Sequence, residues 1–103
     1  MGIRTERHKA RELATDTLYS LDFNSNLPPT GDWDLFQGVS EEEEATLTED
    51  TKVYASFLIT GTLEHLDEID SIISKYSKNR PIENIDCVDR NILRISIFQL
   101  LYD

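Results

Sequence analysis

The first eleven residues hold the side chains whose types and spacing are best suited to bind a ligand. Arg4, Arg7, His8 and Arg11 stand at positions i, i+3, i+4 and i+7, which places them along one side of a helix. A guanidinium group donates two parallel hydrogen bonds to a phosphate, and an imidazole can stack on a base or donate to a phosphate. The helix dipole disfavours cations at an N-terminus, so their position favours a functional interpretation. An ordinary solvated helix end is the alternative.

Charge is distributed unevenly along the chain. The 103 residues carry 20 acidic and 10 basic side chains, for a net charge of −10, and the first eleven residues hold four of the ten basic ones. Residues 31–50 contain acidic side chains and neither lysine nor arginine. This balance excludes a uniformly basic nucleic-acid binder, but it permits a basic patch on an acidic body. The run Glu41–Glu44 is interpreted as a solvated segment, with a docking role as the alternative.

Catalytic and metal-binding patterns are absent from the sequence. It has a single cysteine, Cys87, and two histidines far apart, His8 and His65, and it contains no Gly-rich phosphate loop, HExxH or G-x-S-x-G pattern. Cys87 is expected to be structural, and His65 to be a capping or surface residue at a helix junction. We therefore expect no enzyme, no cofactor and no metal site. No apolar run is long enough to span a membrane and no secretory signal is visible, which favours a cytoplasmic protein.

The periodicity of apolar residues predicts an all-α fold in one domain over residues 1–103. A turn-rich segment at 24–31 ends the first helix, and Thr30 or Asp32 could cap the second, with Trp33 and Phe36 facing the core. An acidic loop is expected at about 39–49. The predicted helices cover about 4–22, 32–38, 50–64, 66–78 and 86–102.

Each longer helix has a predicted buried face. Gly61 is expected to let another helix approach closely. The three faces are Ala10, Leu13, Ala14, Thr17 and Leu21; Val53, Tyr54, Phe57, Leu58 and Gly61; and Leu66, Ile69, Ile73 and Tyr76.

The last segment, 86–102, is apolar around most of its circumference, with Asp86 as its predicted N-cap. A strand is the alternative, because Arg94 and Ser96 alternate with isoleucines. A helix of this kind is usually central and needs neighbours on several sides. We therefore expect the natural protein to continue past Tyr102, or a partner to cover the exposed face.

Several motifs resemble those of the NusB family. RHKARELA at 7–14 and LYSL at 18–21 resemble the family's opening, and VDRNILRISIFQLLY at 88–102 resembles its central helix. FLITGT at 57–62 and IDSII at 69–73 also fit. The resemblance spans most of the chain except the segment at about 23–50, and the central-helix motif is its most specific part.

The resemblance implies an all-helical bundle with two helical subdomains, whose C-terminal helices are missing from this chain. It implies a transcription antitermination factor that binds boxA-type single-stranded RNA together with NusE, a ribosomal protein. The complex would include RNA polymerase and other Nus factors, usually at ribosomal RNA operons. Family members also occur as homodimers that hide the arginine-rich surface.

The resemblance also assigns site residues. His8 stands where the family commonly has arginine. Contacts to NusE are expected at Asp89, and also at Glu83 and Tyr19. The expected RNA contacts are Arg4, Arg7, His8, Lys9 and Arg11, with Lys75, Tyr76 and Lys78 as an extension of the RNA track.

Two other functions remain open. The chain could be the NusB-like N-terminal domain of a ribosomal RNA cytosine methyltransferase. It could also be a helical protein-interaction module without an RNA role, whose partner binding would survive removal of residues 1–11.

Overall fold

The computed structural model describes residues 3–30, 34–36, 39–78 and 80–103. Within these ranges there is no strand, which confirms the all-α class. The elements in chain order are α1 (Ile3–Phe23), α2 (Glu41–Ala45), α3 (Glu49–Glu64), α4 (Leu66–Tyr76), the 3-10 helix η1 (Ile82–Asn84) and α5 (Cys87–Tyr102).

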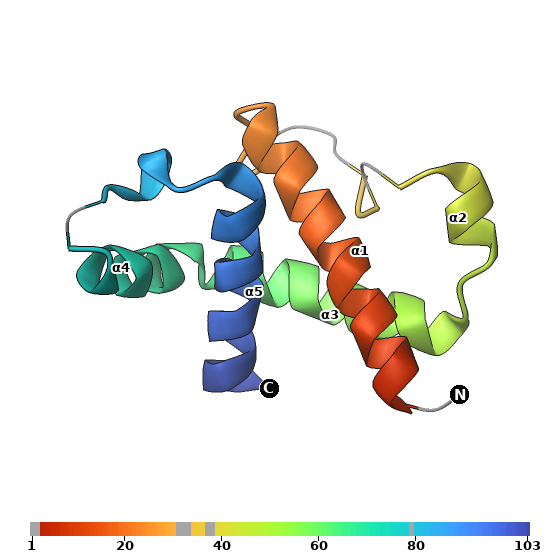
Figure 1. The fold of residues 1–103 in the computed structure, drawn as a ribbon. Helices are drawn as coiled ribbons and strands as arrows, with labels where there is room; N and C mark the ends of the chain where they lie inside the picture. The colour runs from red at the N-terminus through yellow and green to blue at the C-terminus, as the bar shows by residue number, and fades with distance from the viewer. Residues whose placement is uncertain (1–2, 31–33, 37–38, 79) are drawn as a thin grey trace.

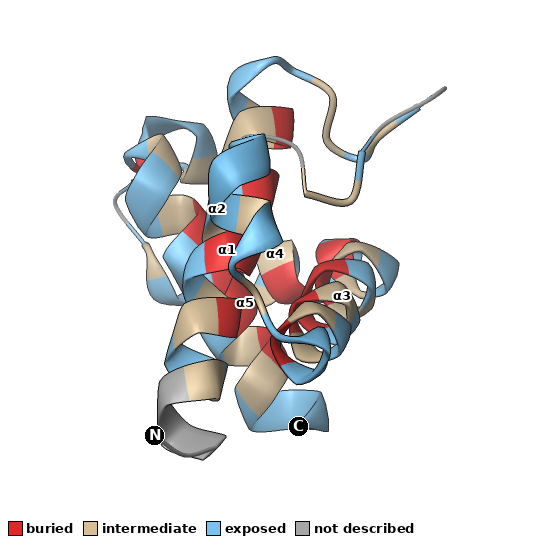
Figure 2. Cartoon of the chain, turned by 90° about the vertical axis from the view of Figure 1, so that its right-hand side faces the viewer, coloured by how far each residue is buried: buried red, intermediate tan, exposed pale blue. Residues whose placement is uncertain are grey.

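Helices α1 and α5 both cross α3, and α4 extends beyond α5 on the far side (Figure 1). Helix α5 contacts α1, α3 and α4, as expected for a central helix. Buried residues line the surfaces where these helices meet (Figure 2). One side of α5 nevertheless stays exposed in this chain, as the side chains of Val88, Ile92, Leu93, Leu100 and Leu101 show.

The predicted buried face of α1 is confirmed. Its five residues are at most 1 % exposed, and Leu18 joins them. Alanines at positions 10 and 14 keep the helix surface flat, so α1 packs directly on α3 and α5.

The predicted face of α3 is wrong in part. Val53 and Phe57 are exposed, although Leu58 is buried as predicted. Both α1 and α5 pack on α3, so the buried stripe of α3 is rotated about the helix axis from the prediction. The buried residues of α3 are Thr51, Ala55, Leu58, Ile59 and Thr62.

The predicted face of α4 is wrong at one position. Leu66, Ile69 and Ile73 are buried, but Tyr76, the last residue of α4, is 81 % exposed, so the buried face ends at Ile73. The helix ends at Tyr76 rather than at 78, since Ser77 leaves the helical conformation.

The segment between α1 and α3 differs from its prediction. Residues 34–36 form a turn rather than a helix, in which the Phe36 amide donates to Asp34 Oδ1 at 3.1 Å. Phe36 packs against the core as expected, whereas Asp32, Trp33 and positions 37 and 38 lie outside the described residues.

The predicted acidic loop contains a short helix, α2. It forms because the Ser40 hydroxyl accepts from the Glu43 amide at 3.1 Å and the glutamates of the first turn complement the helix dipole. The same kind of cap starts α3 at Thr48 and α5 at Asp86, and the cap at Asp86 was predicted.

A buried polar network joins the end of α1 to α5. Oδ2 of Asp22 accepts from Arg90 Nε at 2.7 Å, from Asn91 Nδ2 at 3.0 Å and from Arg94 Nη1 at 3.0 Å. Asn91 is fully buried and Arg94 is 5 % exposed, so the hydrogen bonds are formed largely away from water. Charge-assisted bonds in such surroundings are strong and geometrically specific.

The same arginines extend the network to α4 and η1. Arg94 forms a bidentate pair with Asp70 of α4, with N–O distances of 2.8 and 3.0 Å. Arg90 Nη1 donates to the carbonyl oxygens of Ile82 and Ile85 at 3.2 and 3.1 Å. The network therefore connects α1, α4, η1 and α5.

Gly61 permits close contact between α3 and α5. A Cβ atom built on Gly61 would lie 2.2 Å from Cζ of Phe98, a ring that is 2 % exposed. The predicted close approach of a helix at Gly61 is confirmed.

We expect Gly61→Ala to destabilise the fold by about 1–3 kcal/mol, because overpacking against Phe98 outweighs the higher helix propensity of alanine. The measurement is urea unfolding followed by circular dichroism. The control is Thr60→Ala, an exposed neighbour on α3, which should change stability by less than about 0.5 kcal/mol. Equal stability of the Gly61→Ala variant and the unaltered chain would contradict the packing described.

We also expect Asp22→Asn to destabilise the fold by about 1–3 kcal/mol at neutral pH. Burial alone would raise the pKa of Asp22, but hydrogen bonds from Arg90 and Asn91 and the charge of Arg94 outweigh it and hold the pKa below 3.8. Because the folded-state pKa is lowered, the ionised carboxylate stabilises the fold above 3.8, and this stabilisation is lost as pH falls through the folded-state value.

The stability difference between the unaltered chain and Asp22→Asn should therefore narrow as pH falls below 3.8, in urea unfolding across an acid pH series. The matched control is Asp67→Asn, which alters an exposed carboxylate of α4. A difference that stays constant through the acid range would show that the charge of Asp22 contributes nothing.

Candidate nucleic-acid interface

The start of α1 and the end of α5 lie at the same end of the molecule, and the two helices diverge toward it (Figures 1 and 2). They are tied together at the other end by the hydrogen bonds to Asp22. Two hollows lie beside the basic half of α1, one lined by residues of α1 and α5 and the other by residues of α1 and α3, and we call them together the notch.

Arg7 lies over an aromatic ring of α3 and remains exposed. Its guanidinium carbon is 4.8 Å from the centroid of the Tyr54 ring, a cation–π geometry that orients the charge while leaving its donors free. The Tyr54 hydroxyl donates to Asp103 and accepts from Gln99 Nε2 at 3.0 Å. Burial and the bond to Asp103 raise the pKa of Tyr54, so the ring stays neutral beneath Arg7.

A groove runs beside this position, between α1 and α5. His8 Nε2 lies 3.3 Å from Glu12 Oε1, and both side chains are mostly exposed. The Thr15 hydroxyl donates to the Arg11 carbonyl oxygen at 2.8 Å, which leaves its methyl group and a lone pair at the surface. The residues that line the groove are His8, Arg11, Glu12, Thr15 and Asp16 of α1 with Ile92 and Ser96 of α5.

His8 and Arg11 thus line the part of the notch toward α5, whereas Arg7 lines the part toward α3. Lys9 is half-buried and does not line the groove. Arg4 lies in the first turn of α1, and its side chain is outside the described part of the chain. Acidic residues accompany the cations, since Glu6 and Asp50 line a hollow together with Arg7 and Tyr54.

Lys75, Tyr76 and Lys78 are exposed at the end of α4. This end lies across α5 from the start of α1, so the structure does not bring these residues next to the basic half of α1 (Figure 1). They form a separate surface.

The three residues expected to bind a protein partner surround the first turn of α5. Tyr19 stacks on Phe23 with ring centroids 5.6 Å apart, and its carbonyl oxygen lies 4.0 Å from Cys87 Sγ. Asp89 is exposed in the first turn of α5, and Glu83 is exposed in η1.

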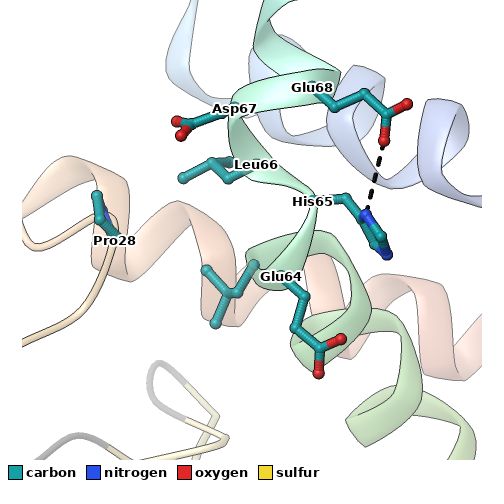
Figure 3. A pocket seen from close by; sticks show the side chains of 7 residues that line it. Pro28, Glu64, His65, Leu66, Asp67 and Glu68 are labelled. Carbon is teal, nitrogen blue, oxygen red and sulfur yellow. Dashed lines mark ion pairs between the residues drawn. The ribbon is translucent and has the colours of Figure 1, made fainter.

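The hollow at the α3–α4 junction has an acidic rim (Figure 3). It is lined by Pro28 and residues 63–68, and Glu64, Asp67 and Glu68 would repel phosphates. His65 lies at this junction, as expected, with Nδ1 3.6 Å from Glu68 Oε1 and its ring stacked on another aromatic ring. Nucleic acid therefore fits the notch at α1 better than this hollow.

The described residues give little support for thiol catalysis, metal binding or a membrane-spanning helix. Burial and the neighbouring Asp22 carboxylate raise the pKa of the Cys87 thiol, which disfavours the reactive thiolate. Within the described ranges, no cluster of His, Cys, Asp or Glu could hold a metal ion. No described helix is both long and apolar enough to cross a membrane.

Sequence reasoning missed the polar network and the aromatic support of Arg7. Arg90 and Arg94 stand four residues apart on a helix rich in apolar residues, and arginines that are buried with such a helix need ion-pair partners. Their partners Asp22 and Asp70 are too distant in sequence to be identified by spacing.

Comparison with known proteins identifies the family. The model described as "NusB family" matches residues 8–103. The transcription antitermination protein NusB of Thermodesulfovibrio yellowstonii is 39 % identical over 104 residues, covering 94 % of this chain and 67 % of the relative. The NusB protein of Geobacter sp. is 40 % identical over 105 residues, covering 95 % and 69 %.

No solved structure matches the chain. This chain spans about two thirds of the length of these two relatives. Both are named as transcription antitermination proteins, which are regulatory factors and not enzymes. The match to the family model over nearly the whole sequence shows that this chain belongs to the NusB family.

Proposed function

We propose that the chain is a transcription antitermination factor that binds boxA-type single-stranded RNA together with NusE, a ribosomal protein. It would act in the cytoplasm, in a complex with RNA polymerase and other Nus factors, during transcription of ribosomal RNA operons. Membership of the NusB family and the name shared by the relatives support this proposal.

The observation that carries the RNA proposal is the group of cations at the notch. Arg7 and His8 are exposed and Arg11 is half-exposed, so phosphates can reach all three from solvent. Tyr54 supports Arg7 from below, which limits the entropy lost when the arginine binds. The net charge of −10 repels RNA from the rest of the surface and confines binding to this region.

Nearby carboxylates moderate this attraction. Glu12 pairs with His8, and Glu6 and Asp50 lie in the hollow that Arg7 lines. RNA binding therefore replaces existing electrostatic contacts, and sequence recognition relies on the bases, as is usual for single-stranded RNA.

A second contact for the RNA is proposed at Lys75, Tyr76 and Lys78. The exposed tyrosine ring could stack on a base between the two cations. Only an RNA strand that crosses α5 would reach the surface at the end of α4 from the notch.

The surface around the first turn of α5 is proposed to bind NusE. It combines exposed carboxylates at Glu83 and Asp89 with the Tyr19–Phe23 aromatic stack. Aromatic residues framed by charge are typical of protein interfaces, and the carboxylates favour a basic partner. A homodimer that hides the basic surface would compete with RNA.

We expect Arg7→Ala combined with Arg11→Ala to remove most RNA binding, because two phosphate contacts are lost. The measurement is fluorescence anisotropy of a labelled boxA-type RNA at several salt concentrations. About four cationic contacts predict a log–log salt slope of roughly −3 for the unaltered chain, and the double variant should reduce its magnitude by about 1.4.

The charge-matched control is Lys52→Ala combined with Arg80→Ala, which should retain most of the affinity. Adding purified NusE should strengthen RNA binding, and Asp89→Asn should reduce only that increase. Intact RNA binding by the Arg7 and Arg11 double variant would refute the assignment of the notch.

A further inference from the structure

Asp16 is a carboxylate in the wall of the groove, on the surface proposed to bind RNA. No hydrogen bond or ion pair involves its side chain among the residues that the structure describes. Asp16 is exposed to solvent, and its partial burial, followed by the charges of Glu43 and Glu12, raises its pKa, so these surroundings disfavour its charge. The polar contacts of the described residues do not explain why a carboxylate stands at position 16.

A carboxylate at this position would weaken a site that bound phosphates alone. It repels the RNA backbone, and asparagine would fill the same space without that cost. A carboxylate gains from RNA only by accepting hydrogen bonds from donors on a base. Its place on the cation-bearing helix α1, in the groove that faces α5, therefore indicates base recognition beside phosphate binding.

The other groove residues suit a base. Ile92 and the Thr15 methyl group offer apolar surface for a base ring, and Ser96 offers a hydroxyl. Arg11 and His8 lie along the same groove and can hold the adjoining phosphates. His8 and Arg11 of α1 thus hold the backbone, while Thr15 and Asp16, one turn further along α1, contact the base together with the facing residues of α5.

We propose that Asp16 accepts hydrogen bonds from the Watson–Crick edge of an unpaired guanine whose backbone lies along Arg11 and His8. This inference rests on the proposed RNA-binding function. Guanine presents two adjacent donors, N1–H and the N2 amino group, which match the two oxygens of a carboxylate. Uracil has one donor between two carbonyls, while adenine and cytosine place a ring acceptor beside their amino group.

The test uses labelled oligouridine strands of about twelve nucleotides that contain one central guanine, adenine or inosine. We expect the unaltered chain to bind the guanine strand about 10-fold more tightly than the adenine strand, since a bidentate contact gives discrimination of about this size. Inosine lacks the N2 amino group and should bind with intermediate affinity. Asp16→Asn should abolish the preference for guanine.

Asp67→Asn is the charge-matched control, because it removes an exposed carboxylate on α4 and should keep the preference. Asp16→Glu retains a carboxylate acceptor and should keep part of the preference for guanine. This variant tests the inference even if Asp16→Asn folds poorly. Thermal unfolding establishes that each variant is folded.

Two results would overturn the inference in distinguishable ways. If Asp16→Asn raises the affinity for all strands equally, Asp16 only repels phosphate, and the RNA-binding proposal stands without guanine recognition. If the unaltered chain binds none of the strands and no boxA-type RNA, the proposed function itself fails and the inference fails with it.

Discussion

The carboxylate of Asp22 is the group on which the arrangement of the helices depends most. It sits near the end of α1 and accepts three hydrogen bonds from side chains of α5. Arg94 then connects α5 to Asp70 of α4, and Arg90 holds two carbonyl oxygens around η1. Removing one member would leave buried charges or donors without partners, which is costly. This cost explains why the last residues of α1 cannot slide along α5.

The position of this network determines the shape of the opposite end. Because α1 and α5 are held together near Asp22, they diverge toward the start of α1 and the end of α5. Contact between Gly61 and Phe98 holds α3 against α5, which brings Tyr54 beneath Arg7. The basic half of α1 is therefore presented on a rigid helix beside a groove, and it is not a free arm.

The features that could be predicted from the sequence are those that depend on residues within one segment. The buried face of α1, the cap of α5 and the close approach at Gly61 all follow from side-chain type, size and spacing within one segment. The face of α3 was misjudged because two helices pack on it, so hydrophobicity alone does not identify the inner side. Tyr76 was misjudged because the apolar periodicity extends to the last residue of α4, whereas burial ends at Ile73. The grouping of Arg7 with Tyr54, and of Arg11 with Ile92, depends on tertiary contacts that spacing does not reveal.

The central claim is that RNA binds in the notch beside the basic half of α1. The most direct measurement is a titration of isotope-labelled chain with boxA-type RNA, followed by the shifts of backbone amide signals in two-dimensional NMR spectra. Binding in the notch predicts that the largest shifts occur in the first half of α1 and around Ile92 and Ser96 of α5. Shifts concentrated in α2 or at the acidic α3–α4 junction, with α1 unaffected, would contradict it.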